Sequence, residues 1–245
     1  MSQSDEPDKP EAEDATLAGQ PDAHVPSLDE LEAAMLWAFE GQEITPDLRS
    51  RYAAHAHFIL TKNREINLTA ITDAREVAAK HYLDSWRATR FLSLLGKNVL
   101  DLGSGAGYPG IPVAMAELET RFTLLDSTQK RVFVIQEAIE RFGLRNAKAL
   151  HARGEDHLTT HRYDIVMMRA VSSVRENVRT LRKVKHALKD LVMWKGPSWS
   201  REVRAGERET ERLGFRLDTV FEYKLPGELG ERAILVYRAP GGQGA

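Results

Sequence analysis

The sequence predicts an α/β fold, in which a doubly wound sheet of seven mostly parallel strands follows a small helical cap. Two observations carry this prediction. From Asn98 onward, short apolar runs alternate with segments of helical periodicity, which is typical of a parallel sheet. The first apolar run ends in Asp101 and is followed by glycines at alternate positions, Gly103, Gly105 and Gly107. A turn of this kind lets main-chain N–H groups come close to a nucleotide-like ligand.

Residues 27–91 are expected to form the cap, because helix starts recur within them. Ser27-Leu-Asp-Glu has the form of a capping box, and apolar residues follow it at helical spacing. Thr45-Pro46 is a second start, with the proline at the first helical position. A third helix is expected to begin at Thr72 or Asp73 and to run to about Phe91.

Residues 92–240 are expected to form the sheet domain. The predicted strands are Val99–Asp101, Phe122–Asp126, Lys148–His151, Asp164–Met168, Leu191–Trp194, Leu217–Tyr223 and Ala233–Tyr237. The predicted helices between them are Ile111–Leu118, Gln129–Phe142, Ser173–Lys189 and Arg201–Leu213. Because no helical segment separates the last two strands, we expect them to close the sheet as an antiparallel hairpin.

Charge and composition narrow the class of protein. Residues 1–30 carry a net charge of −8, so the rest of a chain whose total is −2 carries +6. Residues 1–26 are expected to be a disordered acidic tail, and 241–245 a short C-terminal tail. The chain has no cysteine, which excludes disulfides, thiolate metal sites and cysteine nucleophiles. We expect no metal and no membrane segment, and a cytoplasmic monomer.

The residues around the glycine turn favour S-adenosylmethionine over NAD as the ligand. Asp126 ends the second strand, where an acid accepts hydrogen bonds from ribose hydroxyls; a helix cap is the alternative. The carboxylate of Asp101 would repel a pyrophosphate, whereas it would attract a ligand that carries an ammonium and a sulfonium. Pro109 and Pro112 also remove N–H groups that a pyrophosphate would need. We therefore expect Gly103, Gly105 and Asp126 to bind S-adenosylmethionine.

Several motifs together resemble one family, the bacterial 16S ribosomal RNA guanine-N7 methyltransferases, also called glucose-inhibited division protein B. The motifs are Gly103-Ser-Gly-Ala-Gly-Tyr-Pro-Gly-Ile-Pro, Leu124-Leu-Asp126-Ser-Thr-Gln-Lys130-Arg131, Asn67-Leu-Thr-Ala-Ile and His81-Tyr-Leu-Asp84-Ser85. The resemblance covers roughly residues 45–240. It implies a Rossmann-like class I methyltransferase fold and a target guanine in the 530 loop of 16S rRNA.

The resemblance also implies which residues contact the cofactor. They are Gly103, Tyr108, Gly154, Glu155 and Arg169. Tyr108 stands where the family more often has Phe or Leu, and Gly154 where a small apolar residue is usual. Tyrosine keeps an aromatic face and glycine keeps a backbone contact, so both positions remain in the expected site.

Methylation of guanine N7 requires alignment more than acid–base chemistry. N7 has an in-plane lone pair and no proton, so we name no catalytic residue. The reacting atoms must be held in line in a dry pocket. His81 is expected to be a structural hydrogen-bonding residue. Asp84, one helical turn later, could orient His81 or cap a neighbouring segment.

Basic residues predict where RNA binds. Arg169 ends the fourth strand, at the sheet edge where ligands of open α/β sheets lie, and is expected to contact cofactor or RNA phosphate. An ion pair with Glu155 or Asp101 is the alternative. Lys195 ends the next strand. The predicted helix 173–189 carries a cationic excess, with Arg175, Arg179 and Arg182 as candidate phosphate contacts, although many basic helix faces are only solvated.

Three other functions stay open at this point. The fold could carry a methyltransferase for a small molecule or a protein, since substrate choice lies in the cap and rim. The glycine pattern could belong to an NAD-dependent oxidoreductase. The chain could also be a non-catalytic RNA-binding factor in ribosome assembly. The favoured partner is 16S rRNA or the small ribosomal subunit.

Overall fold

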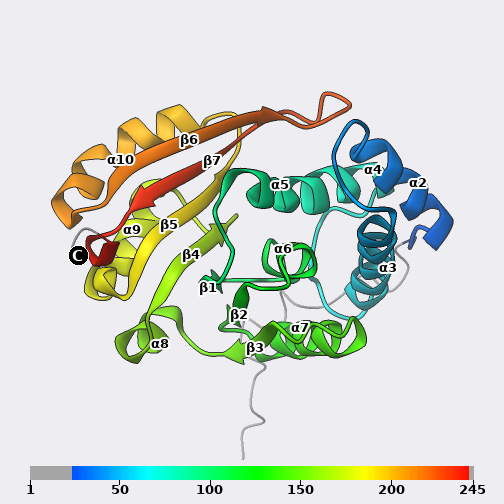
Figure 1. The fold of residues 1–245 in the computed structure, drawn as a ribbon, viewed down its shortest axis with the longest axis horizontal. Coiled ribbons are helices and arrows are strands. Elements are labelled where there is room, and N and C mark those ends of the chain that lie inside the picture. Colours follow the sequence, from blue (N-terminus) through cyan, green and yellow to red (C-terminus); the bar gives the residue numbers. More distant parts are fainter. Residues whose placement is uncertain (1–23, 243–245) are drawn as a thin grey trace, which may run out of the picture.

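A seven-stranded sheet organises the molecule (Figure 1). The computed structural model describes residues 24–242. The sheet has the strand order β3-β2-β1-β4-β5-β7-β6. The strands are β1 (Asn98–Leu102), β2 (Arg121–Asp126), β3 (Ala147–His151), β4 (Tyr163–Arg169), β5 (Leu188–Lys195), β6 (Arg216–Lys224) and β7 (Glu231–Arg238).

The pairing confirms the predicted sheet. Strands β1 to β5 are all parallel, and β7 runs antiparallel to both β5 and β6. The terminal hairpin is therefore present, with β7 inserted between β5 and β6. The strand order reverses between β1 and β4, and the crevice at such a switch point is where open α/β sheets bind ligands.

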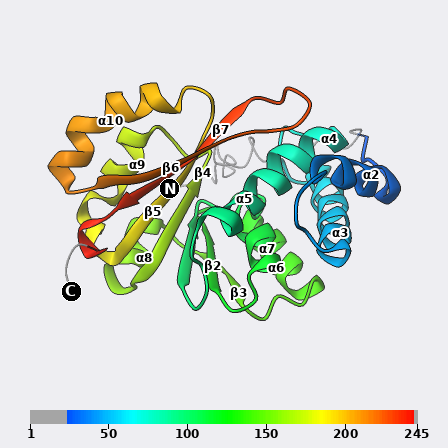
Figure 2. The ribbon, with the colours of Figure 1, turned by 45° about the horizontal axis from the view of Figure 1, so that its top comes forward.

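Helices cover both faces of the sheet (Figures 1 and 2). On one face lie α6 (Gly110–Ala116) and α7 (Gln129–Arg141), and on the other lie α8 (Gly154–Thr160), α9 (Val174–Thr180) and α10 (Trp199–Leu213). Side chains alternate along each strand, so Ile165 and Met167 of β4 join one apolar cluster while Val166 and Met168 join the other. The fold is thus doubly wound, as predicted.

The cap begins where the sequence predicts. Ser27 caps α2 (Leu28–Ala38) through a complete capping box, and Thr45 caps α3 (Pro46–Asn63). The third helix starts after Asp73 and ends at Phe91, but it has three parts: α4 (Ala74–Val77), a π-helix, η1 (Ala78–Leu83), and α5 (Asp84–Phe91). Apolar residues of the cap and of the α6–α7 face form one continuous cluster.

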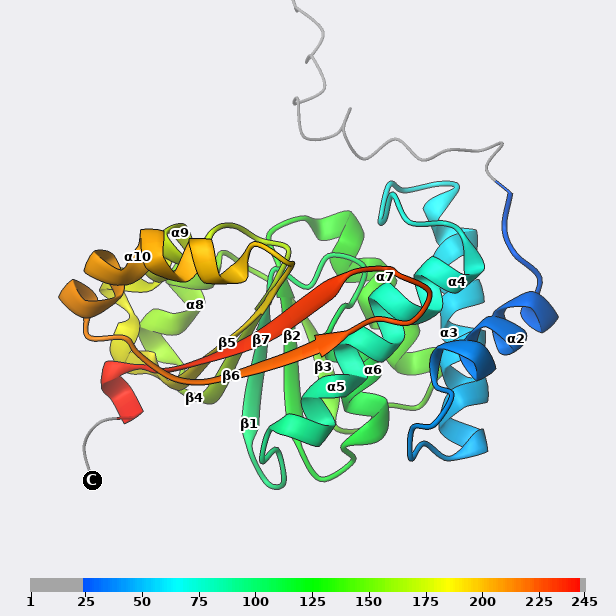
Figure 3. The ribbon, with the colours of Figure 1, turned by 90° about the horizontal axis from the view of Figure 1, so that it is seen from above.

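The β6–β7 hairpin joins the far edge of the sheet to the cap (Figure 3). At its tip, a Cβ on Gly227 would lie 2.8 Å from Cζ2 of Trp37 in α2, so the backbone there packs directly against the indole. Leu225 is buried in the same cluster as the cap. The hairpin therefore fixes the cap against the sheet.

One predicted helix is wrong. Residues 173–189 do not form a single helix, because α9 ends at Thr180 and two short 3₁₀ turns (η2, Leu181–Lys183; η3, Lys185–Ala187) lead into β5. The buried residues after α9 are Leu181, Val184 and Ala187, at intervals of three. That interval matches the 3₁₀ period of three residues per turn. The two turns therefore keep these three side chains buried while the chain changes direction.

Two other differences concern the ends of the chain and a missed helix. Helix α8 was not predicted. The predicted tails, 1–26 and 241–245, lie mostly outside the described residues, but 240–242 form a short 3₁₀ turn, η4. A Cβ on Gly241 would lie 2.5 Å from the carbonyl oxygen of Leu188, so this part of the predicted C-terminal tail packs against the start of β5.

Candidate functional site

The glycine loop after β1 is shaped by main-chain hydrogen bonds to β2. The N–H groups of Gly103 and Ser104 donate to the carbonyl of Leu125, at 2.9 and 3.0 Å. Gly103, Gly105 and Gly107 have φ angles of +77°, +58° and +92°. Side chains rarely tolerate these angles, so the alternate glycines are required by the turn itself. The loop follows the first strand, as the sequence predicts, and the strand order places it at the switch point.

Asp101 is fully buried beneath this loop. Its Oδ2 accepts the Gly110 N–H at 2.9 Å, and a Cβ on Gly110 would lie 2.6 Å from the same oxygen. Oδ1 is also buried and has no hydrogen-bond partner among the described residues. Burial raises the pKa of this carboxyl to about 6. A buried carboxylate with one unpaired oxygen is a natural partner for a cationic group of a ligand.

Asp126 lies on the other side of the loop and is 4% exposed. Its two carboxylate oxygens accept the N–H groups of Gly105 and Thr128, both at 2.9 Å, and Arg131 lies 3.9 Å away. The contact with Thr128 agrees with the alternative role of Asp126 as a helix cap, because Thr128 directly precedes α7. Each carboxylate oxygen has two lone pairs, so the same side chain can still accept ribose hydroxyls.

Gly154 and Glu155 begin α8 beside the ends of β1 and β3. A Cβ on Gly154 would lie 2.3 Å from Cδ1 of Leu102, so a larger residue here would require the Leu102 side chain to shift. Glu155 is exposed in the first turn of the helix. The structure thus places this pair against the strand that carries the glycine loop.

Arg169 ends β4, and its side chain turns toward the cap. Nη1 donates to the Lys80 carbonyl at 2.9 Å and to Oδ2 of Asp84 at 3.1 Å, and Nη2 donates to Nδ1 of His81 at 2.6 Å. The predicted ion-pair partners, Glu155 and Asp101, are wrong: the carboxylate is that of Asp84. The Lys80 carbonyl belongs to the π-helix, a form of helix that is frequent at functional sites.

His81 is a neutral acceptor in this arrangement. A guanidinium only donates, so Nδ1 accepts from Arg169 and Nε2–H donates to Oγ1 of Thr69 at 2.9 Å. Burial and the charge of Arg169 hold the pKa of His81 well below its ordinary value. The structural role predicted for His81 agrees with these contacts.

Asp84 is buried, and three elements meet at it. Besides Arg169, Oδ1 accepts from the hydroxyl of Tyr223 in β6 at 2.7 Å, and its main-chain carbonyl accepts from Nε1 of Trp194 in β5 at 2.9 Å. Burial raises the pKa of Asp84. Sequence reasoning proposed that Asp84 orients His81 or caps a segment; it orients Arg169 instead.

Tyr108 connects the glycine loop to the same cluster. Its ring stacks on His81 with centroids 4.4 Å apart, and the guanidinium of Arg169 lies 5.5 Å from the ring centre. Its hydroxyl lies 3.0 Å from that of Tyr82, which in turn lies 2.7 Å from Nδ1 of His55. Nothing in the sequence signalled the part played by Tyr82 and His55, because their partners are far apart along the chain.

The predicted RNA contacts fall into two groups. Lys195 is nearly buried, and its ammonium contacts Glu202 at 2.9 Å and the carbonyl of Ser172. The other three residues, here named the arginine triplet, are exposed; they are Arg175, Arg179 and Arg182. Within the triplet, Arg179 pairs with Glu209 of α10 at 3.1 Å.

A cleft of about 390 Å³ opens beyond the ends of β4 and β5, between the sheet and the cap. Arg169 and Lys195 both line it, as expected for residues that end neighbouring parallel strands. The remaining lining residues are Ile71, Lys80, Asp84, Ala170, Trp194, Gly196, Pro197 and Arg232.

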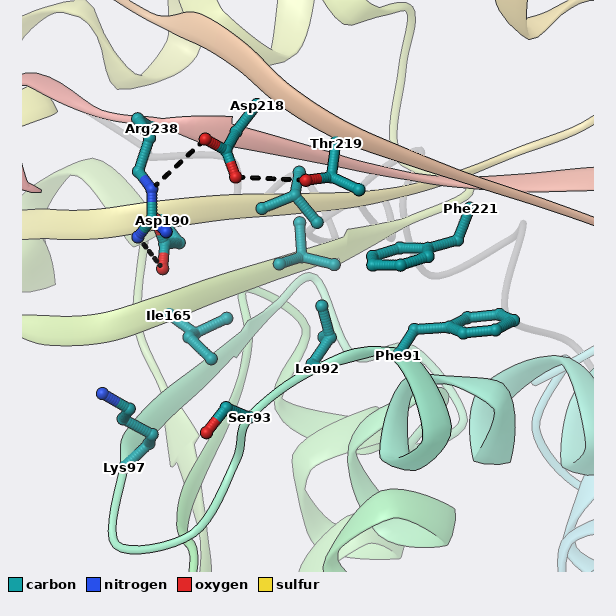
Figure 4. A pocket seen from close by; sticks show the side chains of 12 residues that line it. Phe91, Leu92, Ser93, Lys97, Ile165, Asp190, Asp218, Thr219, Phe221 and Arg238 are labelled. Atoms are coloured by element: carbon teal, nitrogen blue, oxygen red, sulfur yellow. Dashed lines mark hydrogen bonds and ion pairs between the residues drawn. The ribbon is translucent and has the colours of Figure 1, made fainter.

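A second hollow, of about 230 Å³, lies on the sheet face below α5 (Figure 4). Phe91 and Phe221 stack at one end of it, with centroids 4.7 Å apart. At the other end Arg238 pairs with Asp190 at 2.7 Å. None of the predicted site residues lines this hollow.

Within residues 24–242, no group of three or more His, Cys, Asp or Glu side chains is arranged to hold a metal ion. In the same part of the chain, no helix has both the length and the apolar character needed to span a membrane.

The sequence is similar to known proteins over most of its length. The profile of the family GidB, rRNA small subunit methyltransferase G, matches residues 49–229. A protein from Solibacter usitatus with the name ribosomal RNA small subunit methyltransferase G is 39% identical over 211 residues, covering 83% of this chain and 100% of that protein. A protein of the same name from Carboxydothermus hydrogenoformans is 30% identical over 202 residues, covering 81% and 86%.

Solved structures agree on the fold. A methyltransferase from Pyrococcus furiosus superimposes with a TM-score of 0.52 at 12% identity, covering 64% of this chain and 81% of that one. At this level of identity the likeness concerns architecture only, and it matches the class I methyltransferase fold that the sequence predicts.

Proposed function

This chain belongs to the rRNA small subunit methyltransferase G family, and from that premise we propose that it methylates N7 of a guanine in the 530 loop of 16S rRNA. As a member of the family it is an S-adenosylmethionine-dependent rRNA methyltransferase. The guanine, its N7 atom and the 530 loop are the finer part of the proposal and rest on the motifs of the sequence.

The observation that carries the cofactor assignment is the pair of buried carboxylates flanking the glycine loop. S-adenosylmethionine supplies an electrophilic methyl group on sulfur and carries an ammonium and a ribose. Asp101 offers an unpaired oxygen for a cation, and Asp126 is suited to ribose hydroxyls. We assign the cofactor to Gly103, Gly105, Tyr108, Asp126, Gly154, Glu155 and Arg169.

The chemistry of the site fits alkylation of a lone pair. Guanine N7 carries no proton, so the reaction needs no general base. His81, the histidine beside Arg169, is neutral and both its ring nitrogens are engaged. Arg169 and Tyr108 are likewise held by the cap, which gives the walls of the site a fixed geometry. Preorganised positioning is the contribution that such a reaction requires of the protein.

The substrate is proposed to be 16S rRNA, free or within the small ribosomal subunit, bound by a monomer in the cytoplasm. The arginine triplet supports an RNA surface next to the site, because its side chains are exposed and α9 follows directly after the strand that ends in Arg169. Lys195 is proposed to contribute to RNA binding as a residue that lines the cleft, with its ammonium paired with Glu202.

The decisive experiment uses 30S particles from a strain that lacks the enzyme. The protein is incubated with these particles and methyl-labelled cofactor, and the modified base is mapped by chemical cleavage at N7-methylguanine. A single labelled guanine in the 530 loop is expected. Label at another base would overturn the site of modification, and label in a protein or small molecule would favour the alternative substrates.

A further inference from the structure

We propose that the cleft beyond β4 and β5 holds one nucleotide of single-stranded RNA, and that Arg232 contacts its phosphate. The inference rests on the proposed function, because it names where that RNA substrate enters. Arg232 lies in β7, the antiparallel strand next to β5, and no feature of the sequence pointed to it.

Cationic side chains line the cleft. Its four cationic lining residues are Lys80, Arg169, Lys195 and Arg232. Three of them are paired with carboxylates, at 3.0 Å with Glu76, 3.1 Å with Asp84 and 2.9 Å with Glu202 respectively. Within residues 24–242, Arg232 forms no ion pair; its Nη1 donates to the carbonyl of Glu231, and its charge acts on Asp84 from beyond ion-pair distance. The cleft therefore keeps one net positive charge, and that charge is on Arg232.

The walls of the cleft also include apolar residues. Ile71 of the cap and Pro197 supply apolar residues to the same cleft as the arginine, and Trp194, which is 4% exposed, also lines it. Apolar or aromatic walls next to a cation are what an unstacked nucleotide needs, because the base packs on the walls while the phosphate pairs with the charge. A volume of about 390 Å³ lies in the range of small-ligand sites.

The cleft is connected to the glycine loop through Arg169. Arg169 lines the cleft and also lies 5.5 Å from the ring centre of Tyr108, which follows the loop. Ala170, the next lining residue, has a φ of +54°, an angle that costs a non-glycine residue energy and is found at functional sites. A base in the cleft would thus be next to the loop assigned to the cofactor. Enzymes that act on a base generally take it out of its stack.

The hairpin explains why Arg232 is held there. Tyr223 of β6 pairs with Arg232 in the strand register, and its hydroxyl bonds to Asp84 at 2.7 Å. This bond ties the hairpin to the cap at the position of Arg232. The ribbon of the hairpin reaches the cap in Figure 3. The cleft is therefore formed by three parts of the chain that are remote in sequence: the cap, the strand ends and the terminal hairpin.

The test compares Arg232→Ala with Arg216→Ala. Arg216 is exposed at the opposite end of the same hairpin, about 23 Å away along β6 at roughly 3.3 Å per residue, so both variants lose one charge from one element. RNA affinity for a 530-loop fragment is measured between about 50 and 200 mM salt. We expect Arg232→Ala to bind roughly tenfold more weakly at low salt, and its salt slope to fall by about 0.7, the value for one single-strand phosphate contact. Arg216→Ala should match the wild type.

Two further measurements separate binding from folding. Arg232→Lys keeps the charge and should keep the salt slope, and the affinity for S-adenosylmethionine should be unchanged in all three variants. If Arg232→Ala does not fold, Arg232→Gln takes its place. Equal slopes for the Arg216 and Arg232 variants would overturn the inference while leaving the proposed function intact. A wild-type protein that transfers no methyl group to 16S rRNA would overturn the proposed function instead.

Discussion

Asp101 makes cofactor affinity depend on pH in a calculable way. Burial raises its pKa from the ordinary 3.8 to about 6, although the nearby Ser104 hydroxyl, the Gly110 N–H and the charge of Arg169 lower it; the charge of Asp126 adds to the rise. If the ammonium of S-adenosylmethionine pairs with this carboxylate, binding requires the ionised form. Below pH 6 the ionised fraction falls about tenfold per pH unit, so affinity should fall by about 1.4 kcal/mol per unit.

The same shift predicts the stability of the free protein. The folded state holds the Asp101 proton more tightly than the unfolded chain does, so the free energy of unfolding decreases as the pH rises from about 4 to about 6. Because the pKa of this fully buried carboxyl rises from 3.8 to about 6, the free energy of unfolding changes by an amount on the order of 3 kcal/mol. Cofactor binding should offset part of this loss above pH 6.

Calorimetric titration with S-adenosylmethionine at pH 5, 6 and 7 tests the argument. An α-ammonium stays charged over this range. Burial lowers the pKa of His55 to about 3, outside this range, and burial with the charge of Arg169 also lowers the pKa of His81. Asp101→Asn is the matched control, since its amide oxygen can still accept the Gly110 N–H. Adenosine, which has no ammonium, should bind with little pH dependence. A flat wild-type profile, or an equal slope in Asp101→Asn, would refute the reasoning.

Four further predictions follow from the same geometry. Gly103→Val should fold but lose cofactor binding, because φ is +77° and Val171 lies 3.3 Å from the new Cβ; wild-type affinity by calorimetry would contradict this. Asp126→Ala should weaken cofactor binding by about 1.5–3 kcal/mol, roughly ten- to a hundredfold; unchanged affinity would limit its role to the main-chain bonds. Arg169→Met should lower the free energy of unfolding in urea by about 3–5 kcal/mol, because Asp84 stays buried without its partner. Adding Asp84→Asn to this variant should recover part of the lost free energy of unfolding. If the effects of the two substitutions simply add, the two side chains are not energetically coupled. Replacing the arginine triplet by alanine should flatten the salt dependence of RNA binding, and an unchanged slope would mean a merely solvated surface.

Local sequence determined much of the fold. The capping box at Ser27, the Thr45-Pro46 start and the alternation after Asn98 each depend on neighbours within a few residues, and the structure confirms all three. The glycine loop was predictable for the same reason, since the left-handed angles at its glycines are properties of the backbone.

Tertiary structure decided what those elements contact. The helix predicted over 173–189 ends early because Leu188 joins β5 opposite Tyr163, and the sheet register outweighs helical periodicity there. Arg169 pairs with Asp84, 85 residues away, and no local pattern distinguishes that carboxylate from Glu155 or Asp101. The cleft, likewise, exists only because the terminal hairpin returns to the cap. Hydrogen bonds within a turn are fixed by adjacent residues, whereas the choice among distant partners is made by burial and by the packing of the whole chain.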